Sequence, residues 1–249
     1  MIKVIMHGCN GKMGQMISGL IAADEEIELV AGIDAYDEGK NPYPVFKNIK
    51  ECDVAADAII DFSTASAVDG LLDYCVEKKL PAVVCTTGLS EEQIVTLKEA
   101  SKKVAILKSA NMSLGINMLL KLLKDATAVL APAGFDIEIV EKHHNQKLDA
   151  PSGTALALAG AVREARPELR NRCGREGQCP RTQEEIGIHS LRMGNAAGEH
   201  TVVFSTPTQT LYLGHKAHSR ALYAEGALRA AAFLMAQKPG LYSMKEMLR

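Results

Sequence analysis

Residues 2–14 have the sequence IKVIMHGCNGKMG, and this stretch decides the expected fold. The apolar run Ile2–His7 predicts a buried strand, and the pattern Lys12–Ala23 predicts the helix that follows it. Between them stand three glycines, Gly8, Gly11 and Gly14. Glycine permits a tight turn and lets backbone N–H groups approach a pyrophosphate at a helix N-terminus. The turn therefore indicates a dinucleotide site, with a plain strand–helix connection as the alternative.

Two residues near this turn bear on the cofactor. Asn10 departs from the common G-x-G-x-x-G pattern, although Asn tolerates left-handed backbone better than most residues. Asp34 follows Gly14 by 20 residues, at the end of the expected strand Ile27–Ile33, where a carboxylate can bind ribose hydroxyls. Its alternative role is that of a turn residue. A carboxylate repels a 2′-phosphate, and Lys12 is the one nearby cation, so we expect NADH preference or use of both NADH and NADPH.

Outward from this unit, strands and helices alternate to about residue 113. This alternation predicts a Rossmann-type parallel sheet, an α/β fold. Ser90 and Gln93 are expected to form a capping box. The expected strands are Ala58–Phe62, Pro81–Cys85 and Val104–Leu107, and the expected helices are Ala65–Lys78 and Glu91–Lys102.

The pattern changes after Asn111, which predicts a second, α+β domain. Consecutive strands without helices between them predict an antiparallel or mixed sheet. We expect domain boundaries at 1–113 and 114–220, with the C-terminal helix, 221–249, packing back on the first domain. The expected elements are a helix Leu114–Leu130, a strand Phe135–Glu141, a short helix from Ser152, strands Glu184–Arg192, Glu199–Ser205 and Gln209–His215, and a helix Arg220–Gln237.

Composition narrows the class of protein. A formal net charge of −2 argues against nucleic acid and anionic membrane as partners. No apolar run approaches the roughly 18 to 20 residues of a membrane span, and no signal peptide is recognised, so we expect a cytoplasmic protein. The six cysteines are expected to be reduced thiols, although Cys173 and Cys179 could instead clip the loop Arg166–Arg181 or bind metal. That loop either closes over the site or is mobile.

Residues 138–154, EIVEKHHNQKLDAPSGT, hold the densest chemistry of the chain. His143, His144 and Lys147 leave a strand, and Pro151–Thr154 opens a helix. Cationic and proton-carrying groups beside a helix N-terminus fit an anionic substrate. Each piece alone has a structural alternative: a surface histidine pair, or an ordinary N-cap at Ser152. Adjacent histidines on a strand point to opposite faces, so we expect no metal.

With these motifs, the sequence resembles the 4-hydroxy-tetrahydrodipicolinate reductase (dihydrodipicolinate reductase) family. The family hallmark E-x-H-H/R-x-x-K-x-D-x-P-S-G-T matches Glu141–Thr154. Other segments along nearly the whole chain are also similar: the glycine turn, Asp61–Ser63, Thr86–Gly88, Ala110–Asn117, Gly198–Thr201 and His215–Arg220. The chain departs from the family at Ala65, where proline is common, at Cys85, where glycine is common, and at Asp34, where Glu is common.

The resemblance implies NADH- or NADPH-dependent reduction of 4-hydroxy-tetrahydrodipicolinate in lysine and diaminopimelate biosynthesis. It implies that a hydride reaches ring C4 as the 4-hydroxyl leaves as water, and that His143 or Lys147 supplies the proton. It also implies a homotetramer built on the second domain. Substrate would contact His144, Ser152, Gly153 and Thr154. The cofactor would contact Gly8, Cys9, Asn10, Gly11, Lys12, Met13, Asp34, Cys85, Thr86, Thr87, Ser109, Ala110, Asn111 and Met112.

Two rival functions stay open from the residues alone. Another two-domain reductase or amino-acid dehydrogenase would not need His143, Lys147 and the Ser-Gly-Thr helix start together. A dinucleotide sensor without catalysis would bind cofactor and not turn over. The presence of proton-carrying residues in the expected substrate site favours an enzyme.

Overall fold

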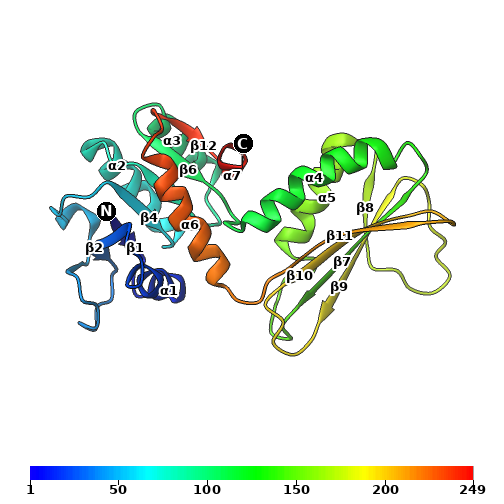
Figure 1. The fold of residues 1–249 in the computed structure, drawn as a ribbon, viewed down its shortest axis with the longest axis horizontal. Coiled ribbons are helices and arrows are strands. Elements are labelled where there is room, and N and C mark those ends of the chain that lie inside the picture. The colour runs from blue at the N-terminus through cyan, green and yellow to red at the C-terminus, as the bar shows by residue number, and fades with distance from the viewer. Residues whose placement is uncertain (249) are drawn as a thin grey trace. The chain divides into compact units, whose positions relative to one another are not determined.

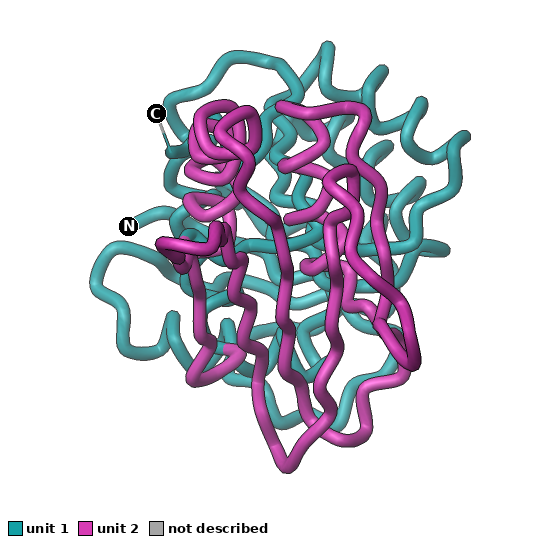
Figure 2. Tube along the Cα trace, turned by 90° about the vertical axis from the view of Figure 1, so that its right-hand side faces the viewer, with its two compact units in different colours: residues 1–114, 221–249 teal, residues 115–220 magenta. Residues whose placement is uncertain are grey.

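The computed structural model describes residues 1–248 and divides the chain into two compact units. The first unit holds residues 1–114 and the chain from Ala221 onward, and the second holds Gly115–Arg220. Figure 2 colours the first teal and the second magenta. The chain therefore leaves the first unit once and returns to it. None of the helices within residues 1–248 combines the length and apolar character that crossing a membrane requires.

A seven-stranded parallel sheet forms the centre of the first unit (Figure 1). Its order is β12-β6-β5-β4-β1-β2-β3, so the chain reverses direction across the sheet between β1 and β4. This confirms the predicted Rossmann-type fold. The strands are β1 (Ile2–His7), β2 (Ile27–Ile33), β3 (Val45–Phe46), β4 (Ala58–Asp61), β5 (Ala82–Val84), β6 (Ala105–Lys108) and β12 (Gly240–Tyr242).

Helices cover both faces of this sheet, because neighbouring residues of a strand point to opposite sides. Along β1, Val4 and Met6 pack with α1 and α6, whereas Ile5 packs with α2 and α3. Ser90 and Gln93 form the predicted capping box at the start of α3. The helices are α1 (Lys12–Ile21), α2 (Val68–Lys78), α3 (Glu91–Ser101), α6 (Ala221–Leu234) and α7 (Met244–Met247), with short 3-10 turns η1 (Ile49–Glu51) and η2 (Ala65–Ala67).

The second unit is a five-stranded mixed sheet of order β11-β10-β7-β9-β8 with two helices. Strand β7 pairs antiparallel with β10 and parallel with β9. Helices α4 and α5 pack on one face, over Ile137 and Ile139 of β7. The elements are α4 (Leu114–Leu130), β7 (Asp136–His143), α5 (Gly153–Ala165), β8 (Arg170–Cys173), β9 (Glu185–Arg192), β10 (Glu199–Ser205) and β11 (Thr210–Lys216).

Several details correct the sequence-based expectations. The stretch Arg166–Arg181 is not only a loop, because β8 forms inside it and pairs with β9. The helix that follows Ser152 is not short but has 13 residues. Strands β9 and β10 follow each other in sequence, yet β7 lies between them. Strands β3 and β12 and helix α7 were not predicted, because each is too short to show a period.

Candidate active site

The glycine turn after β1 leaves the start of α1 open to an anion. Gly8 has φ +82°, and a Cβ there would lie 2.7 Å from the carbonyl oxygen of Phe62. A Cβ on Gly14 would lie 2.2 Å from the carbonyl oxygen of Gly8, so only glycine fits at either position. No side chain caps the first turn of α1 at Gly11. The N–H groups of residues 8–11 already have acceptors within the chain. The first-turn N–H groups of α1 and its dipole are therefore what favour an anion at this turn.

Asp34 lies at the end of β2, beside this turn. Its carboxylate accepts hydrogen bonds from the backbone N–H of Asn10 at 2.9 Å and of Tyr36 at 3.1 Å. A cavity of about 510 Å³ opens here, and it contains Gly8, Gly11 and Asp34 in its wall. The same wall includes residues that the sequence did not point to as cofactor ligands: His7, Lys47, Asn48, Lys50, Ser63, Thr64 and Ser66. His7 ends β1, and the others follow β3 or β4, so all lie at the carboxyl edge of the sheet.

Several predicted cofactor residues have buried side chains. Cys9 is fully buried with its sulfur under Gly32, and Cys85 and Met112 are also buried. Burial raises the pKa of the Cys9 thiol to about 11. Such residues can offer a ligand only backbone groups. Six free thiols are present, with Cys173 exposed and Cys179 partly buried.

A buried polar network lies below the cavity at the end of β4. Asp61 is fully buried, and its carboxylate lies 3.0 Å from Nδ1 of His7. It also accepts hydrogen bonds from the hydroxyls of Thr86 at 2.7 Å and Ser63 at 2.6 Å. Burial would raise the pKa of Asp61, but these partners outweigh burial and lower it. Lys108 donates to the carbonyl of Thr86 at 2.7 Å. The network fixes the ends of β1, β4 and β5 relative to one another.

The two predicted nicotinamide-lining loops follow β5 and β6. Thr86 is buried and Thr87 is exposed. In the second loop, Ser109 donates to the carbonyl of Asn111 at 2.8 Å, and the side chain of Asn111 accepts from the N–H of Ser113 at 2.9 Å. These bonds are turn bonds within the loop. They give the loop a defined shape at the sheet edge that also carries the glycine turn.

In the second unit, β7 directs Glu141 and His143 toward the side that α4 and α5 cover. The strand alternates half-buried and buried residues from Asp136 to His143. Glu141 is fully buried, and its Oε2 makes a short contact with Nδ1 of His143. A buried carboxylate needs partners, and Arg192 supplies them, donating from Nη2 to Oε1 at 2.8 Å and from Nη1 to Oε2 at 3.0 Å.

Charge therefore stays on Glu141 despite its burial. Burial alone would raise the pKa of this carboxyl, but hydrogen bonds from Arg192, and then from Ser190 and His143, lower it to about 2. The backbone N–H of Ser152 also donates to Glu141 Oε1 at 3.2 Å. The site thus contains a permanent anion in contact with an imidazole.

Ser152 and His200 complete the buried side of the site. The Ser152 hydroxyl accepts from the N–H of Ala155 at 3.1 Å, which makes it the N-cap of α5, and lies 3.1 Å from Nε2 of His200. His200 is 4% exposed, and burial lowers its pKa to about 4. The rings of His143 and His200 meet edge to face with centroids 5.1 Å apart. The Ser152 hydroxyl is therefore engaged in holding the helix start.

Lys147 and the start of α5 both contact one carboxylate of the chain, that of Asp149. Lys147 Nζ lies 2.7 Å from Asp149 Oδ1, and this hydrogen bond, with a smaller one from the backbone of Gly153, lowers the pKa of Asp149. A carboxylate of the chain itself is thus bound between Lys147 and the N-terminus of α5. Gly153 is exposed, with open space where a Cβ would stand, and His144 and Thr154 are half-buried.

Glu141, His143 and His200 have possible metal-ligand atoms within 4.8 Å of one another. Arg192 contacts both carboxylate oxygens of Glu141, so a cation placed there would meet a guanidinium at the same oxygens. The donor set suits a hydrogen-bonded network better than a metal centre.

The roles of Arg192 and His200 were not anticipated from the sequence. The structure brings them to the site through strand register: His143 pairs with Arg192 on β9, and Glu141 pairs with His200 on β10. The only local signals were their places at strand ends, and the similarity of Gly198–Thr201 to a family segment. Register between distant strands is not encoded in a local pattern.

The chain is similar to known proteins over its whole length. Residues 2–112 match the family model described as dihydrodipicolinate reductase, N-terminus, and residues 115–248 match its C-terminus. The 4-hydroxy-tetrahydrodipicolinate reductases of Caldanaerobacter subterraneus subsp. tengcongensis and Clostridium tetani are 48% and 46% identical, over 100% of this chain and 99% and 97% of theirs. A solved structure, dipicolinate-bound dihydrodipicolinate reductase from Paenisporosarcina sp. TG-14, has a TM-score of 0.85 at 27% identity and covers 99% of each chain.

Proposed function

The chain belongs to the dihydrodipicolinate reductase family, and we propose that it reduces 4-hydroxy-tetrahydrodipicolinate to tetrahydrodipicolinate with a nicotinamide dinucleotide. It is thus an oxidoreductase of lysine and diaminopimelate biosynthesis. The observation that carries the proposal is the Glu141–Thr154 segment, in which His143 contacts a buried carboxylate and Lys147 lies at the N-terminus of α5. That arrangement combines a proton carrier with an anion site.

The first unit supplies the dinucleotide site. The N-terminus of α1, with Gly8, Gly11 and the backbone of Cys9 to Met13, binds the pyrophosphate, and Asp34 binds ribose hydroxyls. The loops Cys85–Thr87 and Ser109–Met112 line the nicotinamide. The reduced nicotinamide supplies the hydride that reaches ring C4.

The second unit supplies the substrate site for a small dicarboxylate. Lys147 and the backbone N–H groups of Gly153 and Thr154 bind one carboxylate. Lys147 and the backbone of Gly153 contact the carboxylate of Asp149 in a similar way in the free chain. His144 contacts the substrate, and Ser152 acts by starting the helix. An anion at this position is stabilised by the dipole of α5 as well as by Lys147.

The remaining groups manage the proton. The net reaction takes up one hydride and one proton and releases the 4-hydroxyl as water. His143 or Lys147 donates the proton: Lys147 carries it as an ammonium, and His143 exchanges it at the ring nitrogen that does not face Glu141. Arg192 and Glu141 remain an ion pair throughout.

The cavity wall bears on cofactor choice. Asp34 favours NADH, because its carboxylate repels a 2′-phosphate. Lys47 and Lys50 line the same cavity, and both are exposed. Together with Lys12 at the start of α1, these cations offset the carboxylate in part, so we expect NADH preference or use of both NADH and NADPH.

Titration with 2′,5′-ADP and with 5′-ADP tests this preference without turnover. Asp34→Ala should tighten the binding of 2′,5′-ADP relative to that of 5′-ADP. The double variant Lys47→Ala, Lys50→Ala should weaken the binding of 2′,5′-ADP by about tenfold, as expected for loss of phosphate contacts. Equal weakening of both ligands would contradict a role for the lysines at the 2′-position.

The family resemblance also supports a homotetramer built on the second unit and a cytoplasmic location. Size-exclusion chromatography with light scattering tests the first, with four copies per particle expected. A monomer at micromolar concentration that turns over at full rate would contradict it.

The activity itself is tested by nicotinamide oxidation, followed by absorbance. Substrate is made in situ from pyruvate and aspartate semialdehyde by the upstream synthase, with NADH and NADPH in parallel. Oxidation that requires the synthase is expected. Tight dinucleotide binding without oxidation of either cofactor would overturn the proposal and favour a sensor. Retained activity in Lys147→Ala would favour another reductase of the same fold.

A further inference from the structure

We propose that Arg192 and Glu141 form a positioning pair that sets the reactive nitrogen of His143 and holds the Lys147 loop against the start of α5. The inference rests on the proposed function, because it assigns to these residues an effect on that reaction. Neither residue needs to touch the substrate. Their contacts reach the strand, the loop and the helix that carry the proposed substrate groups.

The first contact fixes the imidazole. A carboxylate kept ionised can only accept hydrogen bonds, so the Nδ1 of His143 that faces Glu141 must carry a proton. In the neutral ring, Nε2 is then the nitrogen without a proton. Nε2 is the atom that lies 3.2 Å from the position of a Cβ on Gly198, where glycine leaves room. Glu141 thus selects one tautomer, as a carboxylate does in a serine-hydrolase triad.

The second contact fixes the loop. Arg192 Nη2 donates both to Glu141 Oε1 at 2.8 Å and to the carbonyl oxygen of Asp149 at 2.5 Å. The Met193 N–H donates to the carbonyl of His143 at 2.9 Å, and the Asn145 N–H donates to the carbonyl of Gly194 at 3.2 Å. The segment after β9 therefore runs along the segment after β7. Through its bond to the Asp149 carbonyl, the Arg192 side chain connects these two segments to the loop that carries Lys147.

The third contact fixes the helix start. Glu141 Oε1 accepts from the N–H of Ser152, the N-cap of α5, and so orients the helix end that offers Gly153 and Thr154 to an anion. One buried carboxylate and one guanidinium therefore join all three parts. A lysine at position 192 would retain the positive charge, but a single ammonium cannot reproduce the planar fork over two oxygens.

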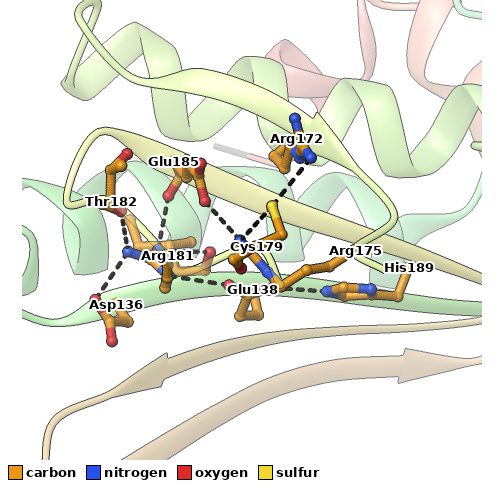
Figure 3. Close-up of polar contacts among 10 residues, drawn as sticks. Asp136, Glu138, Arg172, Arg175, Cys179, Arg181, Thr182, Glu185 and His189 are labelled. Carbon is orange, nitrogen blue, oxygen red and sulfur yellow. Dashed lines mark hydrogen bonds and ion pairs between the residues drawn. The ribbon is translucent and has the colours of Figure 1, made fainter. Parts of the chain in front are cut away.

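The chain offers a matched control in Arg181 (Figure 3). Arg181 also lies against β7, donating to Glu138 at 3.0 Å and to the carbonyls of Ile137 and Glu185 at 3.2 Å and 2.7 Å. Its side chain is 19% exposed, against 18% for Arg192. The polar partners of Arg181 drawn in Figure 3 all lie outside the Glu141–Thr154 segment.

The test compares Arg192→Lys, Arg192→Ala and Arg181→Lys by two measurements. One is steady-state kinetics. The other is ¹⁵N NMR of histidine-labelled protein, in which the tautomer of His143 is assigned with a His143→Gln sample. Arg192→Lys should lower kcat by about 10- to 100-fold with little change in the KM for the dinucleotide, as expected for a misplaced catalytic group. It should also reduce the fraction of His143 protonated at Nδ1, because a lysine cannot hold both oxygens of Glu141 and the carboxylate is then no longer fixed against that nitrogen.

Arg192→Ala should lose more activity, and added guanidinium should restore part of it together with the Nδ1–H signal. Arg181→Lys should leave kcat within about twofold and the His143 signal unchanged, since it disturbs the opposite face. If Arg192→Lys leaves both kcat and the His143 tautomer unchanged, the proposed positioning pair is overturned. It is also overturned if Arg181→Lys changes kcat and the tautomer as much as Arg192→Lys does. If the wild type shows no turnover but its His143 tautomer still depends on Arg192, the pair stands and the reductase proposal fails.

Discussion

Strand β7 carries two glutamates three residues apart, and its two faces use them differently. Glu138 accepts from Arg181 at 3.0 Å and lies 2.7 Å from Nε2 of His189, with 27% of its side chain exposed (Figure 3). Glu141 has the same kinds of partner, Arg192 and His143, but is fully buried on the side of α4 and α5. Each pairs an arginine and a histidine with one carboxylate.

The difference in burial gives the two clusters different roles. The contribution of an ion pair decreases as water reaches it, down to roughly 0 to 1 kcal/mol at the surface, and Glu138 is the more exposed of the two carboxylates. Loss of one partner from a buried pair costs about 3 to 5 kcal/mol, because the other charge is left without compensation. Gly187 leaves space for the Glu138 side chain, because a Cβ at position 187 would lie 1.7 Å from Oε2 of Glu138. The Glu138 cluster is therefore a close-packed structural contact. The Glu141 cluster instead lies beside the helix N-terminus and Lys147.

The largest expected effect is a difference in kcat/KM between variants of two neighbouring residues of β7. His143→Ala should lower kcat/KM by about 10²- to 10⁴-fold, the usual contribution of a general acid or base. Lys142→Ala removes a 3.0 Å bridge to Glu199 on the other face and should change kcat/KM by less than about twofold. The synthase-coupled assay measures both, and equal losses would contradict the division between the faces.

The two glutamates should differ next in stability. Glu141→Ala leaves Arg192 without a carboxylate partner and should lower the free energy of unfolding by about 3 to 5 kcal/mol. Glu138→Ala should lower it by about 1 kcal/mol. Urea unfolding followed by circular dichroism, at one fixed protein concentration, gives both numbers. A larger loss in Glu138→Ala would show that burial does not decide the energetics.

Acid should act mainly on the buried face through His200. The pKa of His200 falls from 6.5 to about 4 on folding. Between pH 6.5 and about 4, His200 therefore binds a proton in the unfolded chain but not in the folded chain. Stability is therefore complete above about pH 6.5 and decreases by about 3 kcal/mol as pH falls toward 4. Below about pH 4.5 the lowered pKa of Glu141 adds a further loss.

His200→Asn should flatten the stability curve between pH 6.5 and 4.5, measured by urea unfolding at half-unit intervals. His189→Asn provides the comparison from the other face, where the side chain is 37% exposed. An unchanged slope in His200→Asn would exclude His200 as the source of the acid sensitivity.

The smallest effect concerns two serines. Ser152→Ala removes the N-cap of α5 and the hydroxyl beside His200 and should cost about 1 to 2 kcal/mol. Ser205→Ala removes a 2.8 Å contact with the Thr210 hydroxyl at the end of β10 and should cost about 0.5 kcal/mol. Thermal unfolding distinguishes them, and a larger shift in Ser205→Ala would contradict the capping role.

Much of the fold could be predicted from local sequence. The glycine turn between Ile2–His7 and α1 and the capping box at Ser90 depend on residues that are close together in the chain. Helix α4 was predicted with its observed limits, Leu114–Leu130, because its apolar period is long. Strand β8, with the sequence RNRC, was missed because it has no apolar alternation.

The hallmark segment of the candidate site stands out in the sequence, but the residues that contact it from other strands do not. The hallmark segment pointed to His143 and Lys147, because cationic and proton-carrying groups stand beside a helix start there. Arg192 and His200 could not be connected to Glu141, because β7 separates β9 from β10 and this order depends on sheet topology. Burial of Glu141 also depends on packing of α4 and α5, which a strand pattern alone does not give.

The measurement that most directly tests the account is kcat/KM of Glu141→Gln against Glu138→Gln in the synthase-coupled oxidation of NADH. Both variants replace a carboxylate on β7 with an amide of nearly equal shape. If the buried face of β7 holds the reactive groups, kcat/KM of Glu141→Gln should be lower than that of the wild type by at least about 100-fold, as expected when a positioned group is displaced. The kcat/KM of Glu138→Gln should match that of the wild type within about twofold. Two folded variants with equal kcat/KM would contradict it.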